Sequence, residues 1–137
     1  IWRVTAKGRP LVERPKLVRA TVPELLERLK DPEDWTRAQA RRVLQERGAK
    51  DVLPELAKWV GKLGADDDHG RLEALWVYQG LDTPEAKLLE ALLTTKDFHA
   101  RAAACRVAGQ WAGRLPDALM VLSPRAADEH PRVRLEA

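Results

Sequence analysis

The chain has 137 residues, 45% of them apolar, which is enough for one domain with a continuous core. Its 24 basic and 21 acidic side chains give a net charge of +3, too small to indicate a nucleic-acid or membrane partner by itself. The single cysteine excludes an internal disulfide and any multi-cysteine metal site, and no apolar run approaches the roughly 18 residues of a membrane span.

The first 21 residues are predicted to form an extended arm. Residues 1–5 alternate apolar and polar side chains, which is typical of a short strand, and Gly8 and Pro10 end this pattern. Pro10 and Pro15 each favour an extended conformation in the residue before them. We expect the arm either to lie across the first helices or to belong to a preceding domain.

Residues 22–137 are predicted to form helical hairpins. Alanine, leucine, arginine and glutamate are abundant, whereas tyrosine and phenylalanine occur once each, a composition that favours helices over sheets. Thr21 and Glu24 have the spacing of a capping box, and Gly48 ends the second helix. The expected helices cover about 22–30, 35–47, 52–63, 70–80, 84–95 and 100–112, with a last pair over 116–137. A proline followed by an acidic residue recurs near the start of the first helix of each pair, at Pro23, Pro54, Pro84 and Pro116.

An Arg-x-x-Ala pattern marks the second helix of each pair. Its clearest copy is residues 97–111, where Asp97 is a predicted N-cap. One apolar stripe with helical spacing follows, formed by Ala100, Ala104, Val107, Ala108 and Trp111. The pattern occurs four times at intervals of 34, 30 and 33 residues, beginning at Arg37, Arg71, Arg101 and Arg134.

The repetition predicts a stack of helix pairs. Each pair is too short to bury its own apolar side, so it must pack on its neighbour. Ankyrin repeats carry Thr-Pro-Leu-His, but Thr83-Pro84 is followed by Glu85-Ala86. The Trp, Leu-Gly and Tyr set of tetratricopeptide repeats is not found in the first helices either.

The second helices carry the motif of a known family. Residues 100–104 and 133–137 closely resemble Asp-x-x-Val-Arg-x-x-Ala-Ala, the signature of the second helix of HEAT-like repeats, and Arg37 and Arg71 fit it more loosely. The short period is similar to that of bacterial phycobilisome-lyase-type repeats. This resemblance implies an all-α fold, a right-handed α-solenoid (α-α superhelix) of about four HEAT-like helix pairs over 22–137, after the extended arm over 1–21.

Residues 1–4, 33–37, 72–81 and 128–134 resemble a more specific group. They are similar to the HEAT segment of large exported planctomycete and verrucomicrobial proteins, in which a sugar-dehydrogenase-like β-propeller precedes the repeats and a c-type haem domain follows. The resemblance implies that the arm is the exit of the last propeller blade, and only on this basis is an exported or periplasmic location suggested. The haem motif Cys-x-x-Cys-His is absent. Because the chain begins without Met and stops inside a repeat, we expect it to be part of a longer protein.

The repeated arginines have two interpretations. They could form a ladder of charge-assisted hydrogen bonds to nearby aspartates or helix-end carbonyls, which holds the pairs in register. They could instead line a groove for phosphates or acidic partners. We favour the ladder, with a basic surface beside it that includes Arg42 and Arg106. The acids considered for the ladder are Asp34, Asp68, Asp97 and Asp128.

The tryptophans also allow two interpretations. Trp59, Trp76 and Trp111 are predicted to fill the core or the seams between pairs. Aromatic side chains interleaved with arginine could instead stack on nucleic-acid bases, as in HEAT-like DNA glycosylases, for which residues 66–68 would have to supply a catalytic aspartate.

Metal and nucleophile chemistry is not expected. Trp35, His69, His99 and His130 precede successive second helices, but stacked helices lie about 8–10 Å apart, so their side chains should not converge on one metal. Cys105 has no clearly placed base to activate it. We therefore predict no catalytic residue, cofactor or metal in this chain.

These observations predict a non-catalytic helical-repeat scaffold for protein–protein or interdomain contacts within a larger multidomain protein. The residues expected to form either its partner-binding surface or its structural ladder are Arg37, Arg71, Arg101, Arg134, Arg42, Arg106 and Trp76. The alternative is a nucleic-acid-binding HEAT-like module, including a DNA glycosylase-like enzyme, whose affinity for DNA would fall steeply with salt.

Overall fold

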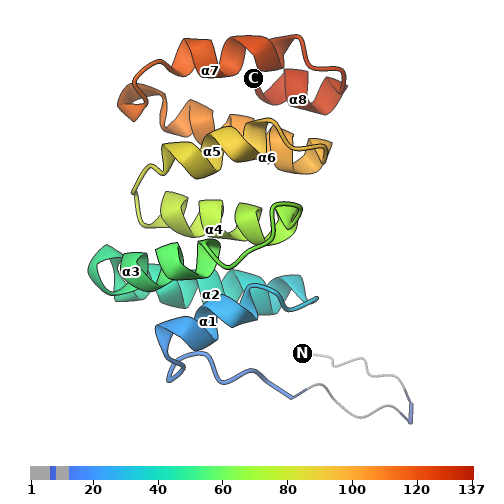
Figure 1. The fold of residues 1–137 in the computed structure, drawn as a ribbon. Coiled ribbons are helices and arrows are strands. Elements are labelled where there is room, and N and C mark those ends of the chain that lie inside the picture. Colours follow the sequence, from blue (N-terminus) through green and yellow to red (C-terminus); the bar gives the residue numbers. More distant parts are fainter. Residues whose placement is uncertain (1–6, 9–12) are drawn as a thin grey trace, which may run out of the picture.

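The computed structural model describes residues 7–8 and 13–137, and these form eight α-helices, one short 3-10 helix and no strand (Figure 1). The expected all-α class is therefore confirmed for this part of the chain. The strand predicted over residues 1–5 lies outside the described residues. The helices are α1 (Val22–Arg28), α2 (Asp34–Arg47), α3 (Ala49–Val60), α4 (Asp68–Gly80), α5 (Ala86–Leu93), α6 (Phe98–Gln110), α7 (Ala118–Ala126) and α8 (Pro131–Glu136), with the 3-10 helix η1 (Ala112–Arg114) before α7.

The helices lie in successive layers, from α1 and α2 at the bottom of Figure 1 to α7 and α8 at the top. Helices that are neighbours in sequence pack together, as α1 does on α2 and α5 on α6. A second set of contacts runs through the even-numbered helices, because α4 packs on α2, α6 on α4 and α8 on α6. These even-numbered helices form a continuous row along the molecule.

Local sequence signals set several helix ends. The Thr21 amide donates to Glu24 Oε2 at 2.6 Å and the Glu24 amide donates to Thr21 Oγ1, so the predicted capping box is present. The Thr21 backbone amide also lowers the pKa of Glu24. The Asp97 side chain caps α6, as expected, by accepting from the His99 amide. Between α2 and α3, Gly48 adopts φ of 86°, a conformation that glycine reaches without steric cost.

A single apolar cluster joins the layers, from Leu17 in the arm to Val133 in α8. The stripe predicted on α6 is buried along its whole length. Small side chains recur where even-numbered helices meet the core, and they allow close approach of the helix backbones. These fully buried alanines are Ala40, Ala74 and Ala104, which stand three positions after successive repeated arginines.

The four repeated prolines do not occupy equivalent positions in their helices. Pro23 lies in the first turn of α1 as predicted, but Pro54 lies inside α3, which begins earlier at Ala49, directly after Gly48. Pro84 and Pro116 precede their helices, because Glu85 and Asp117 are the N-caps of α5 and α7. The repeated proline therefore marks the neighbourhood of each first helix but not its start.

In the first helix of the last pair, the apolar spacing predicts that Ala118, Leu119, Val121 and Leu122 face inward. This is wrong for Leu119, since its side chain is 78% exposed. The cap at Asp117 and the preceding η1 set the register of α7. In that register Val121 and Leu122 pack against the core, and Leu119 points away from it.

None of the described helices has both the length and the apolar character needed to cross a bilayer.

Replacing Leu92 by alanine tests the core. Leu92 in α5 is fully buried, so Leu92→Ala should lower the free energy of unfolding by about 2–5 kcal/mol, measured by urea denaturation followed by circular dichroism. The matched control is Leu119→Ala, which removes the same atoms from an exposed site and should change stability by less than about 0.5 kcal/mol. Equal losses in the two variants would contradict this assignment of the core.

Candidate functional site

The four repeated arginines, which we call the arginine ladder, make the same backbone contact. Each guanidinium donates to the carbonyl of the residue six positions earlier, in the loop before its own helix. Such a bond satisfies a loop carbonyl and fixes the loop to the helix. The four bonds run from Arg37 to Asp31 (2.7 Å), from Arg71 to Ala65 (2.9 Å), from Arg101 to Thr95 (2.9 Å) and from Arg134 to Asp128 (2.8 Å).

Arg101 also reaches the next layer. Arg101 is 5% exposed, and its guanidinium binds both oxygens of Asp128, with Nε to Oδ2 at 3.0 Å and Nη2 to Oδ1 at 2.9 Å. Glu129 adds a longer contact at 3.3 Å. The hydrogen bonds from Arg101 are the main reason why the pKa of Asp128 lies below its ordinary value. The Arg101–Asp128 pair therefore joins α6 to the loop before α8.

Arg37 makes a comparable connection from α2 to α4. Its Nε donates to Glu73 Oε1 at 3.1 Å, and Arg41 binds the other carboxylate oxygen. The Glu73 side chain is only 1% exposed, so these two arginines neutralise a carboxylate that has been removed from water. Arg37 also pairs with Asp34 at the start of its own helix.

The predicted acidic partners are therefore only partly correct. Asp34 and Asp128 bind ladder arginines, whereas Asp97 caps α6 and Asp68 accepts a hydrogen bond from Thr95. Sequence reasoning missed Glu73, because its arginines come from the preceding layer and no local spacing links them. The position of Glu73 two residues after a ladder arginine was the available signal, since Glu136 occupies the same position and also binds an arginine, Arg106.

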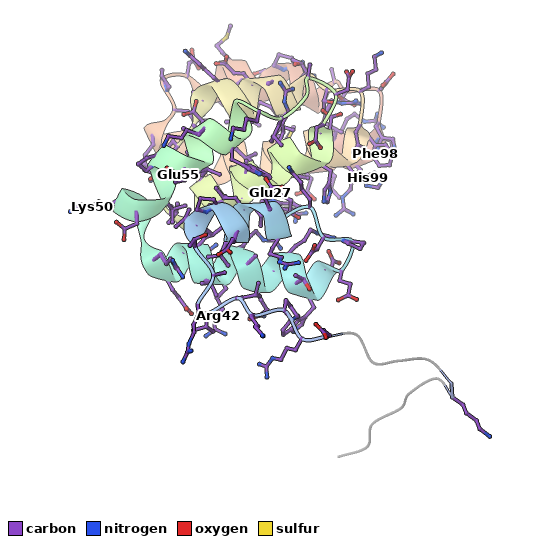
Figure 2. All side chains as sticks on the ribbon, turned by 60° about the horizontal axis from the view of Figure 1, so that its bottom comes forward. Glu27, Arg42, Lys50, Glu55, Phe98 and His99 are labelled. Carbon is purple, nitrogen blue, oxygen red and sulfur yellow. The ribbon has the colours of Figure 1, made fainter. Side chains whose placement is uncertain are left out.

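A second column lies on the surface of the even-numbered helices, five positions after the ladder arginines. We call its members, Arg42, Trp76 and Arg106, the ridge. Arg42, which Figure 2 shows projecting from α2, pairs with Glu46 at 2.9 Å. Arg106 pairs with Glu136, which raises the arginine pKa and lowers that of the glutamate. The basic surface expected here is thus partly compensated by acidic neighbours.

Trp76 is half-buried between neighbouring helices. The Arg41 guanidinium lies over its ring, 5.1 Å from the centroid, in cation–π geometry. Beside it is a shallow hollow of about 420 Å³, which is also lined by Gln45, Gln79 and Gly80. A Cβ at Gly80 would collide with the Gln45 side chain, so glycine allows this close contact. The ridge therefore offers one partly exposed indole among arginines and amides.

Two other tryptophans and His130 are engaged in packing or hydrogen bonds within the protein. Trp111 is buried, and Trp59 is buried with its Nε1 donating to Glu27 at 2.8 Å. His130 stacks on Phe98 with ring centroids 3.6 Å apart, while its Nδ1 accepts from the Arg132 amide. Figure 2 shows Phe98 beside His99 at the edge of the molecule. Over residues 7–8 and 13–137, no group of three or more His, Cys, Asp or Glu side chains is placed to hold a metal.

Cys105 is buried in the core, and this burial raises the pKa of its thiol. A raised pKa favours the protonated thiol, which is the opposite of what activates a cysteine nucleophile. The environment of Cys105 is therefore that of a small apolar side chain.

Comparison of the chain with protein-family models, curated proteins and solved structures gives no match.

Replacing Arg101 tests the contact between layers. Arg101→Met removes both short hydrogen bonds to the buried Asp128 carboxylate and leaves it the longer contact with Arg125, at 3.9 Å, as its cationic partner, so we expect the free energy of unfolding to fall by about 3–5 kcal/mol in urea denaturation. Arg134→Met is the matched control, because this exposed arginine donates only to carbonyls among the described residues and should cost about 1 kcal/mol. In the double variant Arg101→Met/Asp128→Asn, part of the loss should be recovered. Similar losses for Arg101→Met and Arg134→Met would contradict the inter-layer role.

The pKa of Asp128 predicts a specific acid sensitivity. Because the folded-state pKa is lowered, ionised Asp128 stabilises the fold above its unfolded pKa of about 3.9, and this contribution disappears as pH falls through the lower folded-state value. The difference in unfolding free energy between the native chain and Asp128→Asn should therefore be largest above about pH 5 and should shrink below about pH 4. Urea titrations between these limits measure it. The control Leu119→Ala, which changes an exposed side chain without an ionisable group, should give a small difference that does not change with pH.

Proposed function

We propose that the chain is a right-handed α-solenoid of about four HEAT-like helix pairs that serves as a non-catalytic scaffold within a larger protein. The repeated arginine-to-carbonyl bond supports a common repeat unit, because it has the same six-residue offset in all four copies. The continuous row of even-numbered helices supports stacking along one direction. In such a stack, each repeat contributes the same helix face to one extended surface.

The observation that carries this proposal is that several charged side chains of the repeats hold layers together or cap helices. Glu73 and Asp128 neutralise ladder arginines in the core, and Asp67, Asp97 and Asp117 cap helices. A carboxylate that already accepts hydrogen bonds from arginines or backbone amides is less available for proton transfer to a substrate. These groups thus have a structural explanation that requires no reaction.

The ridge is the surface that we assign to partner binding. It combines a partly exposed indole with arginine side chains, and tryptophan and arginine are the residues most enriched among interface hot spots. Glu46 pairs with Arg42, and Glu136 pairs with both Arg106 and Arg132, so acidic neighbours offset part of the positive charge that would attract a phosphate backbone. This favours a protein surface or a flanking domain as the partner over a nucleic acid.

A nucleic-acid-binding module remains the second candidate, because an aromatic side chain stands between two arginines on successive helices, as base stacking would require. It makes a separate prediction. A fluorescent single-stranded oligonucleotide should bind at low salt, with affinity that falls steeply as salt is added and is lost in Arg42→Glu/Arg106→Glu. The scaffold proposal predicts negligible binding at all salt concentrations, measured by fluorescence anisotropy.

Site-specific crosslinking tests the scaffold proposal. A photoreactive benzoylphenylalanine replaces Arg106 on the ridge or, as a control, the exposed Lys87 on α5, in cells that produce the full protein. We expect Arg106 to give a discrete product with one protein or with a flanking domain, identified by mass spectrometry, and Lys87 to give none. The additional change Trp76→Ala should remove the Arg106 product while circular dichroism shows the fold retained. Products that are equal at both positions, or unaffected by Trp76→Ala, would contradict a partner on the ridge.

A further inference from the structure

A groove separate from the ridge lies at the N-terminal end of the helix stack, the end brought forward in Figure 2. One wall is residues 14–19 of the arm, and the other is a stripe of α2 formed by Trp35, Gln39 and Val43. Its volume is about 550 Å³. We call this feature the N-terminal groove.

The arm wall is fixed in place by specific contacts. Leu17 is buried in the core cluster, and its carbonyl accepts a hydrogen bond from the Ala20 amide at 3.1 Å. From α2, Arg47 donates to the carbonyls of Ala20 and Val18. Because both walls are anchored to the same core, the groove is a preformed feature of this end of the molecule.

The shape of the groove follows from the repeat. Gln39 and Val43 stand two and six positions after a ladder arginine, and their equivalents in α4 are Glu73 and Val77. Both of these are buried, and Glu73 lies against α2. The described residues before α1 form no helix, so α2 presents the corresponding stripe to the groove instead of to a preceding helix. The groove is therefore suited to a helix laid along α2.

Both walls of the groove carry exposed apolar side chains. Trp35 is 51% exposed and Val18 is 82% exposed, although both line the same hollow. An exposed tryptophan beside a valine is a strong apolar anchor for a partner side chain. An apolar stripe on an incoming helix would cover both residues.

The charge of the arm wall selects the partner. Arg14, Lys16 and Arg19 are all exposed, and no ion pair to them is found within the described part of the chain. Residues 1–12 contain three basic residues and no acidic one, so like charge disfavours this segment as the occupant. A helix with acidic side chains beside its apolar stripe would complement the wall.

We propose that the N-terminal groove binds an acidic amphipathic helix of a partner protein. The apolar stripe of that helix packs on Trp35, Val43 and Val18, and its carboxylates face Arg14 and Arg19. This is a second binding surface, at one end of the stack, and it does not depend on the role proposed for the ridge.

The probe is a fluorescein-labelled synthetic peptide of about 18 residues, or five helical turns. It carries leucines at helical i, i+3, i+4 and i+7 spacing and glutamates beside them. One control peptide has the same composition with the leucines redistributed, and a second has lysine in place of glutamate. Fluorescence anisotropy should show saturable binding of the first peptide and at least about tenfold weaker binding of both controls.

Variants of the protein locate the binding site. Trp35→Ala and Arg14→Glu/Arg19→Glu should each weaken binding of the acidic peptide by about tenfold or more, and the charge variant should also reduce its salt dependence. The charge-matched control Lys62→Glu/Lys87→Glu, in the turn after α3 and on α5, should leave binding unchanged. Because all the altered side chains are exposed, circular dichroism melting should show that every variant folds.

Four outcomes would overturn the proposal. Three concern the peptide: no binding of the acidic peptide at high micromolar protein, equally tight binding of the redistributed peptide, or an affinity for the acidic peptide that Trp35→Ala leaves unchanged. The fourth is dimerisation of the chain in analytical ultracentrifugation that Trp35→Ala abolishes, which would assign the groove to a second copy. Binding to vesicles of anionic phospholipid without peptide binding would instead assign this end to a membrane surface.

Discussion

The hydrogen bond from each ladder arginine to the carbonyl six residues earlier determines how a loop meets the helix that follows it. A loop between two packed helices has backbone carbonyls that would otherwise lose water without a partner. The guanidinium carries several donors in a rigid plane, so Arg101 can bind a loop carbonyl and a carboxylate of the next layer together. One residue type thus fixes both the local turn and the packing of neighbouring layers.

The buried acids complete this arrangement. Burying Glu73 or Asp128 costs desolvation free energy that the arginines offset only where geometry and hydrogen bonding are good. Such pairs contribute less to net stability than to register, because a shifted layer would leave a buried charge unpaired. Apolar contacts through alanines and leucines provide most of the stabilisation, while the ion pairs select one way of stacking.

A linear stack makes its ends chemically different from its middle. Inside the stack, an even-numbered helix has a neighbour on both sides, and residues such as Glu73 and Val77 are buried. At the N-terminal end, the equivalent stripe of α2 faces residues 14–19 of the arm in the described part of the chain, and Trp35 is left partly exposed. The ridge and the N-terminal groove therefore have different origins: the ridge is formed by equivalent surface positions of α2, α4 and α6, and the groove lies between α2 and the arm, at the first described layer.

The sequence by itself determined the all-helical class of the described residues, the capping box at Thr21, the end of α2 at Gly48 and the buried stripe of α6, because each depends on residues within a few turns of one another. The HEAT-like resemblance, the solenoid and the function stay predictions. Only the tertiary structure decided that Arg37 and Arg41 share Glu73, that Arg101 binds Asp128 and not Asp97, and that Leu119 faces outward. These outcomes depend on the register between layers, which is set by many contacts between residues far apart in the chain and is not encoded in any local spacing.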